Sequence, residues 1–259
     1  MNQSGNKVAF IAGGGRGIGR ATCYKLAEEG YRLAVAARTE AELEEVVETI
    51  GSQGGSVDAY AFDIVDDPAV NAAVKDVIDK HGRIDALVNS AGISYISPVV
   101  MSKIDKCDEV LRVNLLGALI ISKAVLKPMI RQRSGRIVHI GSISGQIGAP
   151  YNAVYAASKA GLAGLVKSIA LEVAATGITC NIVQPGTVRT ELFNQTHGAR
   201  ARVKGITLEE QEQALINENP QRRLVIPEEI AAAVAYLLSD GASSVNGLQL
   251  TVDGGRSII

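Results

Sequence analysis

The sequence predicts an α/β fold, with a doubly wound sheet of seven parallel strands in a single domain over residues 1–259. Short apolar runs rich in Val and Ile alternate with longer segments of helical period, which is the pattern of repeated βα units around a parallel sheet. A glycine-rich turn joins the first apolar run to the first helical segment. No stretch of linker composition divides the chain, so its hydrophobic residues, 47% of the total, are expected to form one core.

The alternating segments place the individual elements. Strands are expected at 7–12, 32–37, 57–62, 84–89, 136–141, 179–184 and 248–252. Helices are expected near 17–29, 40–51, 67–81, 105–132, 153–176 and 227–239. In the third helix Val70, Ala73, Val74, Val77 and Ile78 recur at i, i+3, i+4, i+7 and i+8, and this spacing buries one face against a sheet.

Two features interrupt the pattern. Pro128 falls inside the segment 105–132, so we expect a kink or an early end there. Residues 187–219 form a polar and charged insertion between a strand and the last helix. An insertion of this length after a strand is typical of a lid or binding loop; a solvated surface helix is the alternative.

Composition excludes several classes of partner and compartment. The 26 basic and 27 acidic side chains leave a formal charge of -1, so no overall field attracts nucleic acid or an anionic membrane. Residues 1–7 lack the features of a signal peptide, and the longest uncharged apolar stretch, 230–238, is too short for a bilayer span. Cys23, Cys107 and Cys180 contain no C-x-x-C pair, which argues against a disulfide framework and a metal site. We therefore expect a soluble protein of the cytoplasm.

The glycine-rich turn is the first candidate site. Gly13, Gly14, Gly15, Gly17 and Gly19 lie between the first strand and a helix that starts near Ile18. Glycines let backbone N–H groups approach a pyrophosphate, and a helix N-terminus favours negative charge. A P-loop is excluded because Arg20 and Ala21 replace the required Lys and Ser/Thr. Packing of a tight turn is the alternative to dinucleotide binding.

A second candidate site combines three polar side chains. Tyr155 and Lys159 are spaced i and i+4 at the start of a helix, so they share one face. A nearby ammonium stabilises a phenolate, which suits Tyr155 to acid–base chemistry. Ser142, at the carboxyl end of the strand 136–141, offers a hydroxyl to hold a reacting oxygen.

Together these motifs resemble the short-chain dehydrogenase/reductase family. They occur in the family's order and cover nearly the whole chain: Gly13-Gly-Gly-Arg-Gly-Ile-Gly19, Asn89-Ser-Ala-Gly92, Asn114, Ser142, Tyr155-Ala-Ala-Ser-Lys159 and Pro185-Gly186. The resemblance implies a Rossmann-like fold in which Ser142 binds the substrate oxygen and Tyr155 is the acid/base. It also implies that Lys159 binds the nicotinamide ribose and tunes Tyr155, and that Asn114 anchors a proton-relay water.

The same resemblance implies the cofactor-binding residues. They are Gly13, Gly15, Arg16, Gly17, Ile18, Gly19, Arg38, Asp63, Ile64, Asn89, Ala91, Gly92, Tyr155, Lys159, Pro185, Gly186, Val188 and Thr190. Asp63, with Ile64, is expected at the adenine; capping of the following helix is the alternative for Asp63. Two positions depart from the family pattern, Ala12 in place of Thr and Ser90 in place of Asn, and both bear on the rigidity of the loops.

Residues at the end of the second strand indicate which nicotinamide cofactor is used. NAD-preferring relatives carry an Asp there, whereas this chain has Ala37 followed by Arg38. With Arg16 from the glycine loop, two guanidinium groups can flank a 2′-phosphate, so we expect NADP(H). Two solvated arginines are the alternative, and Glu40 and Glu42 lie close in the sequence.

Two rival functions fit the sequence less well. A serine hydrolase needs Ser at the centre of G-x-S-x-G, where this chain has Ile143. It also needs a downstream His, and only His197 qualifies; helix capping and strand packing explain His81 and His139. A non-catalytic NADP(H)-binding sensor is the other rival, and the intact Ser142, Tyr155 and Lys159 argue against it.

The insertion bears on the substrate. His197, Arg200, Arg202 and Lys204 lie within eight residues and could receive the phosphates of coenzyme A or an acyl carrier protein. The chain most resembles the 3-oxoacyl thioester reductases and 3-hydroxyacyl dehydrogenases of the family, so we expect a 3-oxoacyl thioester. A small ketone, sugar or alicyclic alcohol is the runner-up, and a basic turn balanced by the glutamates of 209–212 is the alternative for the cluster.

The remaining expectations concern the pocket and the assembly. Pocket shape is expected to depend on residues 93–99, 143–151 and 187–219. The resemblance also implies a homotetramer, built on the helices 105–132 and 153–176 and on the chain near 252–255.

Overall fold

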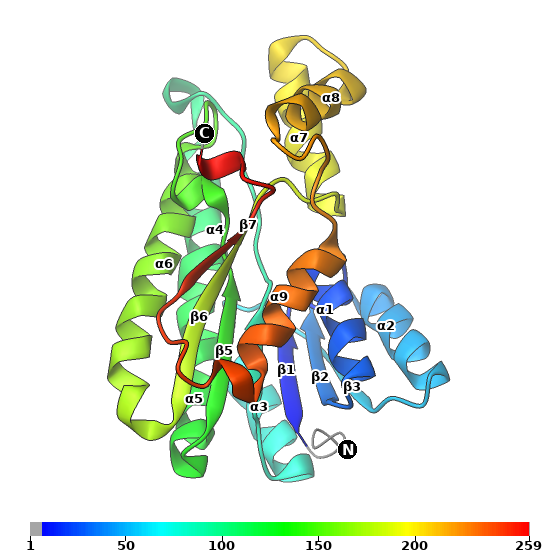
Figure 1. Ribbon diagram of the computed structural model, residues 1–259, viewed down its shortest axis with the longest axis vertical. Helices are drawn as coiled ribbons and strands as arrows, with labels where there is room; N and C mark the ends of the chain where they lie inside the picture. The colour runs from blue at the N-terminus through cyan, green and yellow to red at the C-terminus, as the bar shows by residue number, and fades with distance from the viewer. Residues whose placement is uncertain (1–6, 259) are drawn as a thin grey trace.

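A seven-stranded sheet forms the centre of the computed structural model, which describes residues 7–258 (Figure 1). The strands are all parallel and lie in the order β3-β2-β1-β4-β5-β6-β7. Their bounds are β1 Val8–Ala12, β2 Arg32–Ala37, β3 Val57–Ala61, β4 Ala86–Asn89, β5 Gly135–Ile140, β6 Ile178–Pro185 and β7 Gln249–Val252. The order reverses between β1 and β4, so the predicted doubly wound fold is confirmed. The start of the chain, where no signal peptide was expected, lies outside the described residues.

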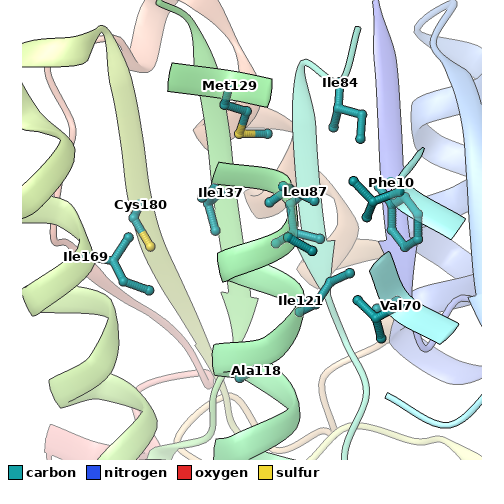
Figure 2. Packing of buried hydrophobic residues seen from close by; sticks show 14 of the residues in the cluster. Phe10, Val70, Ile84, Leu87, Ala118, Ile121, Met129, Ile137, Ile169 and Cys180 are labelled. Carbon is teal, nitrogen blue, oxygen red and sulfur yellow. The ribbon is translucent and has the colours of Figure 1, made fainter. Parts of the chain in front are cut away.

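Helices cover both faces of the sheet. One face packs against α1 (Gly17–Glu28), α2 (Glu40–Ser52) and α9 (Pro227–Leu238). The other packs against α3 (Asp67–His81), α5 (Gly117–Gln132) and α6 (Ala153–Val173), with α4 (Ile104–Leu111) beside α6. Figure 2 shows Ile121 and Met129 of α5 among Leu87 and Ile137 of the strands. Two apolar layers thus cover the two faces of the sheet.

The predicted helix 105–132 is interrupted, although not at its proline. A π-helical turn, Arg112–Leu116, separates α4 from α5. Pro128 lies inside α5, which continues to Gln132, so the expected early end at the proline is wrong.

By length and composition, the stretches Ile104–Gln132 and Ala153–Thr176 could each cross a membrane. Both supply core residues to one face of the sheet, among them Ile121 and Leu162. Packing against the strands therefore accounts for the apolar residues on the buried faces of these helices.

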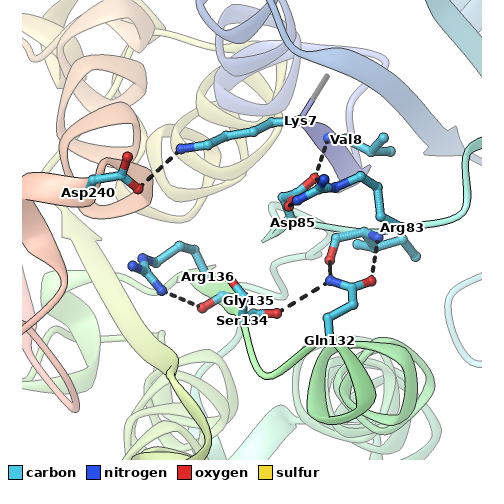
Figure 3. A network of polar contacts seen from close by, with 10 residues as sticks. Lys7, Val8, Arg83, Asp85, Gln132, Ser134, Gly135, Arg136 and Asp240 are labelled. Carbon is cyan, nitrogen blue, oxygen red and sulfur yellow. Dashed lines mark hydrogen bonds and ion pairs between the residues drawn. The ribbon is translucent and has the colours of Figure 1, made fainter. Parts of the chain in front are cut away.

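A polar network closes the amino edge of the sheet (Figure 3). The Asp85 carboxylate accepts hydrogen bonds from the Val8 N–H at 2.8 Å and from two nitrogens of the Arg83 guanidinium at 2.8 and 2.6 Å. The Gln132 amide bonds to both the N–H and the carbonyl of Ile84, at 3.0 and 2.9 Å. These contacts satisfy the backbone where the strands begin, whereas the carboxyl edge opens onto a cavity.

The insertion 187–219 consists mainly of two helices, α7 (Glu191–Lys204) and α8 (Leu208–Glu218). They stand beyond the carboxyl ends of the strands (Figure 1). An isolated bridge joins Val188 to Val225, so the segment leaves and rejoins the domain at one place. The insertion is thus mostly helical rather than a loop, and it contains two helices rather than the single surface helix of the alternative. Its role as a lid stays a prediction.

Candidate active site

The carboxyl ends of the strands border a cavity of about 700 Å³. It lies where the strand order reverses, the usual ligand position in an open α/β sheet. Every site residue expected from the sequence lines it except Gly19, Asn89 and Asn114. Those three support the cavity walls, as their contacts below indicate.

The glycine loop forms one wall and depends on close backbone approach. Gly13 has a φ of +75°, and a Cβ there would lie 2.5 Å from the Ala91 nitrogen. A Cβ on Gly19 would lie 2.0 Å from the Gly13 carbonyl oxygen. The helix α1 begins at Gly17, and within residues 7–258 no side chain caps its start, so its first N–H groups are free for an anion. This cradle fits the pyrophosphate of a dinucleotide.

A buried chain of polar side chains fixes the loop that follows β4, on the other side of the cavity from the glycine loop. The Asn89 Oδ1 accepts a hydrogen bond from the Ala91 N–H at 3.2 Å, and its Nδ2 lies 3.3 Å from the His139 Nδ1. Burial, with a smaller contribution from the Lys159 charge, lowers the pKa of His139 to about 3. The neutral ring therefore accepts from Asn89 and donates through Nε2 to the Ser122 hydroxyl at 3.1 Å. His139 has the packing role expected, and through Asn89 it also orients Ala91.

Tyr155 and Ser142 face each other across the cavity floor. Burial raises the pKa of Tyr155, and a hydrogen bond with the Ser142 hydroxyl lowers it by a smaller amount. Ser142 follows β5 and is only 9% exposed, and its Oγ also accepts from the Ser144 N–H at 3.1 Å. At neutral pH Tyr155 is therefore protonated and lies close to a second hydroxyl, as a proton donor to a carbonyl oxygen would be.

Lys159 lies close to Tyr155, as the i, i+4 spacing requires. Its Nζ is 5.7 Å from the centroid of the Tyr155 ring, and it donates a hydrogen bond to the Ile140 carbonyl at 2.9 Å. Burial lowers the pKa of Lys159 to about 8. Burial dominates the pKa of Tyr155, and the tuning of this pKa by the Lys159 ammonium stays a prediction.

From within the π-helical turn, Asn114 ties the loop after β4 to the helix α6. Its Oδ1 accepts from the Ile93 N–H at 2.8 Å, and its Nδ2 donates to the Ile93 carbonyl at 2.9 Å and the Ser158 hydroxyl at 3.0 Å. Ser158 in turn donates to the Tyr155 carbonyl at 2.7 Å. Such π-helical turns often occur at functional sites. The water relay implied for Asn114 stays a prediction.

The far side of the cavity carries the residues expected near the adenine. Asp63 and Ile64 both line it. The Asp63 Oδ1 accepts from the Val65 N–H at 3.2 Å, while Asp66 accepts from the Ala69 N–H and caps α3. The helix-capping alternative for Asp63 is therefore wrong.

Arg16 and Arg38 both line the cavity at the end of β2. Arg38 is exposed and follows Ala37 directly. Arg16 forms an ion pair with Glu42, at 3.5 Å between Nη1 and Oε1. The positive charge of one of the two guanidinium groups is therefore partly neutralised by a carboxylate.

The remaining wall is built from parts of the segments expected to shape the substrate pocket, and of the segment 93–99 only residues 93 and 94 line the cavity. The cavity is lined here by residues 147–151, in the loop before α6, and by residues 192, 193 and 196 of α7. The structure divides the expected basic cluster: His197, Arg200 and Lys204 line the cavity, whereas Arg202 is exposed and does not. Arg256 also lines the cavity, and sequence reasoning missed it because it lies in a short 3-10 turn without periodicity.

Comparison with known proteins gives consistent matches. Residues 7–201 match the family model described as short chain dehydrogenase. The chain is 36% identical over 259 residues to the 3-oxoacyl-(acyl-carrier-protein) reductase FabG of Vibrio cholerae, covering 100% of both chains. Its structure is similar to the actinorhodin polyketide ketoreductase with NADPH (TM-score 0.96, 33% identity, 100% of both chains). It is also similar to an NAD⁺-bound xylitol dehydrogenase (TM-score 0.93, 32% identity, 98% of this chain and 100% of that one).

Proposed function

Because this chain belongs to the short-chain dehydrogenase family, we propose that it is an NADP(H)-dependent oxidoreductase that interconverts a ketone and a secondary alcohol. The observation that carries the proposal is the convergence of Ser142, Tyr155 and Lys159 on the cavity whose other wall is the glycine loop. A non-catalytic sensor would have no need of the two hydroxyls of Ser142 and Tyr155 on one cavity.

Each residue has a distinct task in ketone reduction. The Ser142 hydroxyl holds the carbonyl oxygen, and Tyr155 donates its phenolic proton to that oxygen as the alcohol forms. Lys159, fixed by the Ile140 carbonyl, places a positive charge beside the phenolate that remains. NADP(H), when bound, supplies the hydride for reduction or accepts it in the reverse reaction. In the oxidation direction Tyr155 takes the alcohol proton, which requires the phenolate and so favours high pH.

Preference for NADP(H) rests on the end of β2. Ala37 leaves no carboxylate there to bind ribose hydroxyls or repel a 2′-phosphate. Arg38 and Arg16 line the same part of the cavity and offer charge-assisted hydrogen bonds. The solved structures with NADPH and with NAD⁺ are about equally similar in sequence to this chain, so they do not favour either cofactor. The proposed preference for NADP(H) therefore rests on the side chains of Arg16 and Arg38.

We propose a 3-oxoacyl thioester as the substrate, because the relative from Vibrio cholerae that covers the whole chain is a 3-oxoacyl-(acyl-carrier-protein) reductase. A small ketone, sugar or alicyclic alcohol is the second candidate, favoured by the likeness to a xylitol dehydrogenase. The insertion 187–219 would act as a lid over either substrate, since its two helices line the cavity.

We also propose a cytoplasmic homotetramer. Apolar side chains are exposed on the helices expected at the interface, Leu111 of α4, Leu119 of α5 and Leu171 of α6. Cys23, Cys107 and Cys180 are free thiols, as suits a reducing compartment.

The test is steady-state oxidation of NADPH with a panel of 3-oxoacyl thioesters, sugars and alicyclic ketones. Tyr155→Phe removes only the ionisable oxygen, so turnover should fall by at least roughly 10²- to 10⁴-fold while NADPH still binds. Tyr236→Phe, an exposed tyrosine outside the cavity, is the matched control. Near-normal turnover in Tyr155→Phe would assign the proton transfer to another group.

A further inference from the structure

The side chain of Arg200 is a half-buried cation with few partners. Its Nη2 donates to the Pro150 carbonyl at 3.4 Å, and its buried Nε has no hydrogen-bond partner within residues 7–258. Over the same residues it forms no ion pair. Leaving a buried N–H of a charged group unpaired is costly, so this guanidinium suits a ligand that supplies acceptor oxygens.

Helix geometry directs Arg200 into the cavity and Arg202 away from it. His197, Arg200 and Lys204 are spaced by three and four residues and share one face of α7. All three line the cavity. Arg202 is two residues further along, on another face, and is exposed to solvent. The two arginines therefore differ in position although they are close in sequence.

The charges around Arg200 leave an excess of positive charge at this end of the cavity. Arg200, Lys204 and Arg256 face one carboxylate, Glu218. Glu218 is paired with Arg256 at 2.9 Å, and Lys204 bonds to the neutral Gln211 at 3.0 Å. Burial lowers the pKa of Arg200, and Glu218 only partly opposes it. Burial and the neighbouring cations also lower the pKa of His197 to about 4, so that ring is neutral and adds no charge.

We propose that Arg200 is a specificity-determining residue that binds an anionic group, a carboxylate or a phosphate, of the ketone substrate. Pro150 is five residues before Tyr155, a segment that spans at most roughly 18 Å. An anion held by Arg200 therefore lies within reach of a substrate whose carbonyl is reduced at Tyr155. The inference rests on the proposed function and narrows its substrate class to anionic ketones.

The experiment compares charged and neutral ketones that share the reacting 3-oxo group. One pair is acetoacetate against ethyl acetoacetate, and the other is acetoacetyl-coenzyme A against acetoacetyl-N-acetylcysteamine. The readout is the ratio of kcat/KM for the charged over the neutral member, measured in wild type, Arg200→Gln and Arg202→Gln. The first pair reports a carboxylate on the substrate itself, and the second reports the phosphates of its carrier.

In at least one pair the ratio should fall about tenfold or more in Arg200→Gln, the loss expected for one charge-assisted hydrogen bond. It should stay within twofold in Arg202→Gln, and Arg200→Lys, which keeps the charge, should restore most of it. Thermal unfolding and the NADPH dissociation constant establish that each variant is folded. Ratios unchanged by Arg200→Gln in both pairs, or lowered equally by Arg202→Gln, would overturn the inference and leave the reductase assignment intact. A wild-type protein that reduces none of the four ketones would overturn both.

Discussion

Replacing Arg38 by Ala tests the proposed cofactor preference most directly. Arg38 lines the cavity one residue after the pairing of β2 with β3 ends at Ala37, so the substitution removes a guanidinium without disturbing the sheet. A hydrogen bond to a charged group contributes about 1.5–3 kcal/mol. Because Arg38 is exposed, we take the lower end of this range, which corresponds to about a tenfold loss in kcat/KM with NADPH.

The assay is the initial rate of ketone reduction with NADPH and with NADH. Arg32, at the amino end of β2 and also exposed, gives the matched control Arg32→Ala, which should leave both rates unchanged. Arg38→Ala should lower kcat/KM with NADPH about tenfold and with NADH less than twofold. An equal loss with both cofactors, or a wild-type protein that prefers NADH, would refute the reasoning that the end of β2 binds a 2′-phosphate.

Three further predictions follow from the same site. Glu42→Gln releases Arg16 from its ion pair and should raise kcat/KM with NADPH about two- to fivefold, whereas the exposed Glu44→Gln should not; equal effects would contradict this. Lys159 has a pKa of about 8 when folded against 10.5 otherwise, so the unfolded state binds more protons between these values and stability rises with pH across this window. Lys159→Met should abolish turnover, remove that pH dependence and raise the free energy of unfolding at pH 7 by about 1–3 kcal/mol. The measurement is urea denaturation of both proteins at pH 7 and 9.5, and a wild-type stability that falls with pH would contradict the prediction. The proposed tetramer predicts a light-scattering mass four times the 27.1 kDa of one chain, and a monomer at micromolar concentration would exclude it.

The central strands could be located from the sequence because they are buried on both faces. Ala9, Phe10 and Ile11 of β1 are all fully buried, so β1 appears as one continuous apolar run rather than an alternating one. The same reasoning placed β6, where even Asn181 and Gln184 are inaccessible to solvent. The π-helical turn between α4 and α5 could not be found this way, since it continues the apolar period and changes only the hydrogen-bond pattern.

The cavity-lining residues were predictable where the motif itself fixes the backbone, as in the glycine loop. Residues that act through others were harder to assign. The roles expected for Asn89 at the cofactor and for Asn114 at a relay water stay predictions, and the side-chain amides of both hold Ala91 and Ile93 in place. Nothing in the sequence separates an amide that binds a ligand from one that binds the backbone, because both roles use the same donor and acceptor atoms.

The insertion shows why spacing alone did not identify the substrate-binding side chains. In α7 only Phe193 and Ala201 are buried, and Gly198 lies within the helix, so the segment lacks the apolar stripe by which a helix is recognised. When no helix is predicted, nothing in the sequence distinguishes the position of Arg200 from that of Arg202, and both belong to the same basic cluster. Once the residues are helical, a separation of two places them on different faces, and only Arg200 reaches the cavity. Which of the two arginines lines the cavity is therefore set by the helical phase of α7 rather than by the number of basic residues in the insertion.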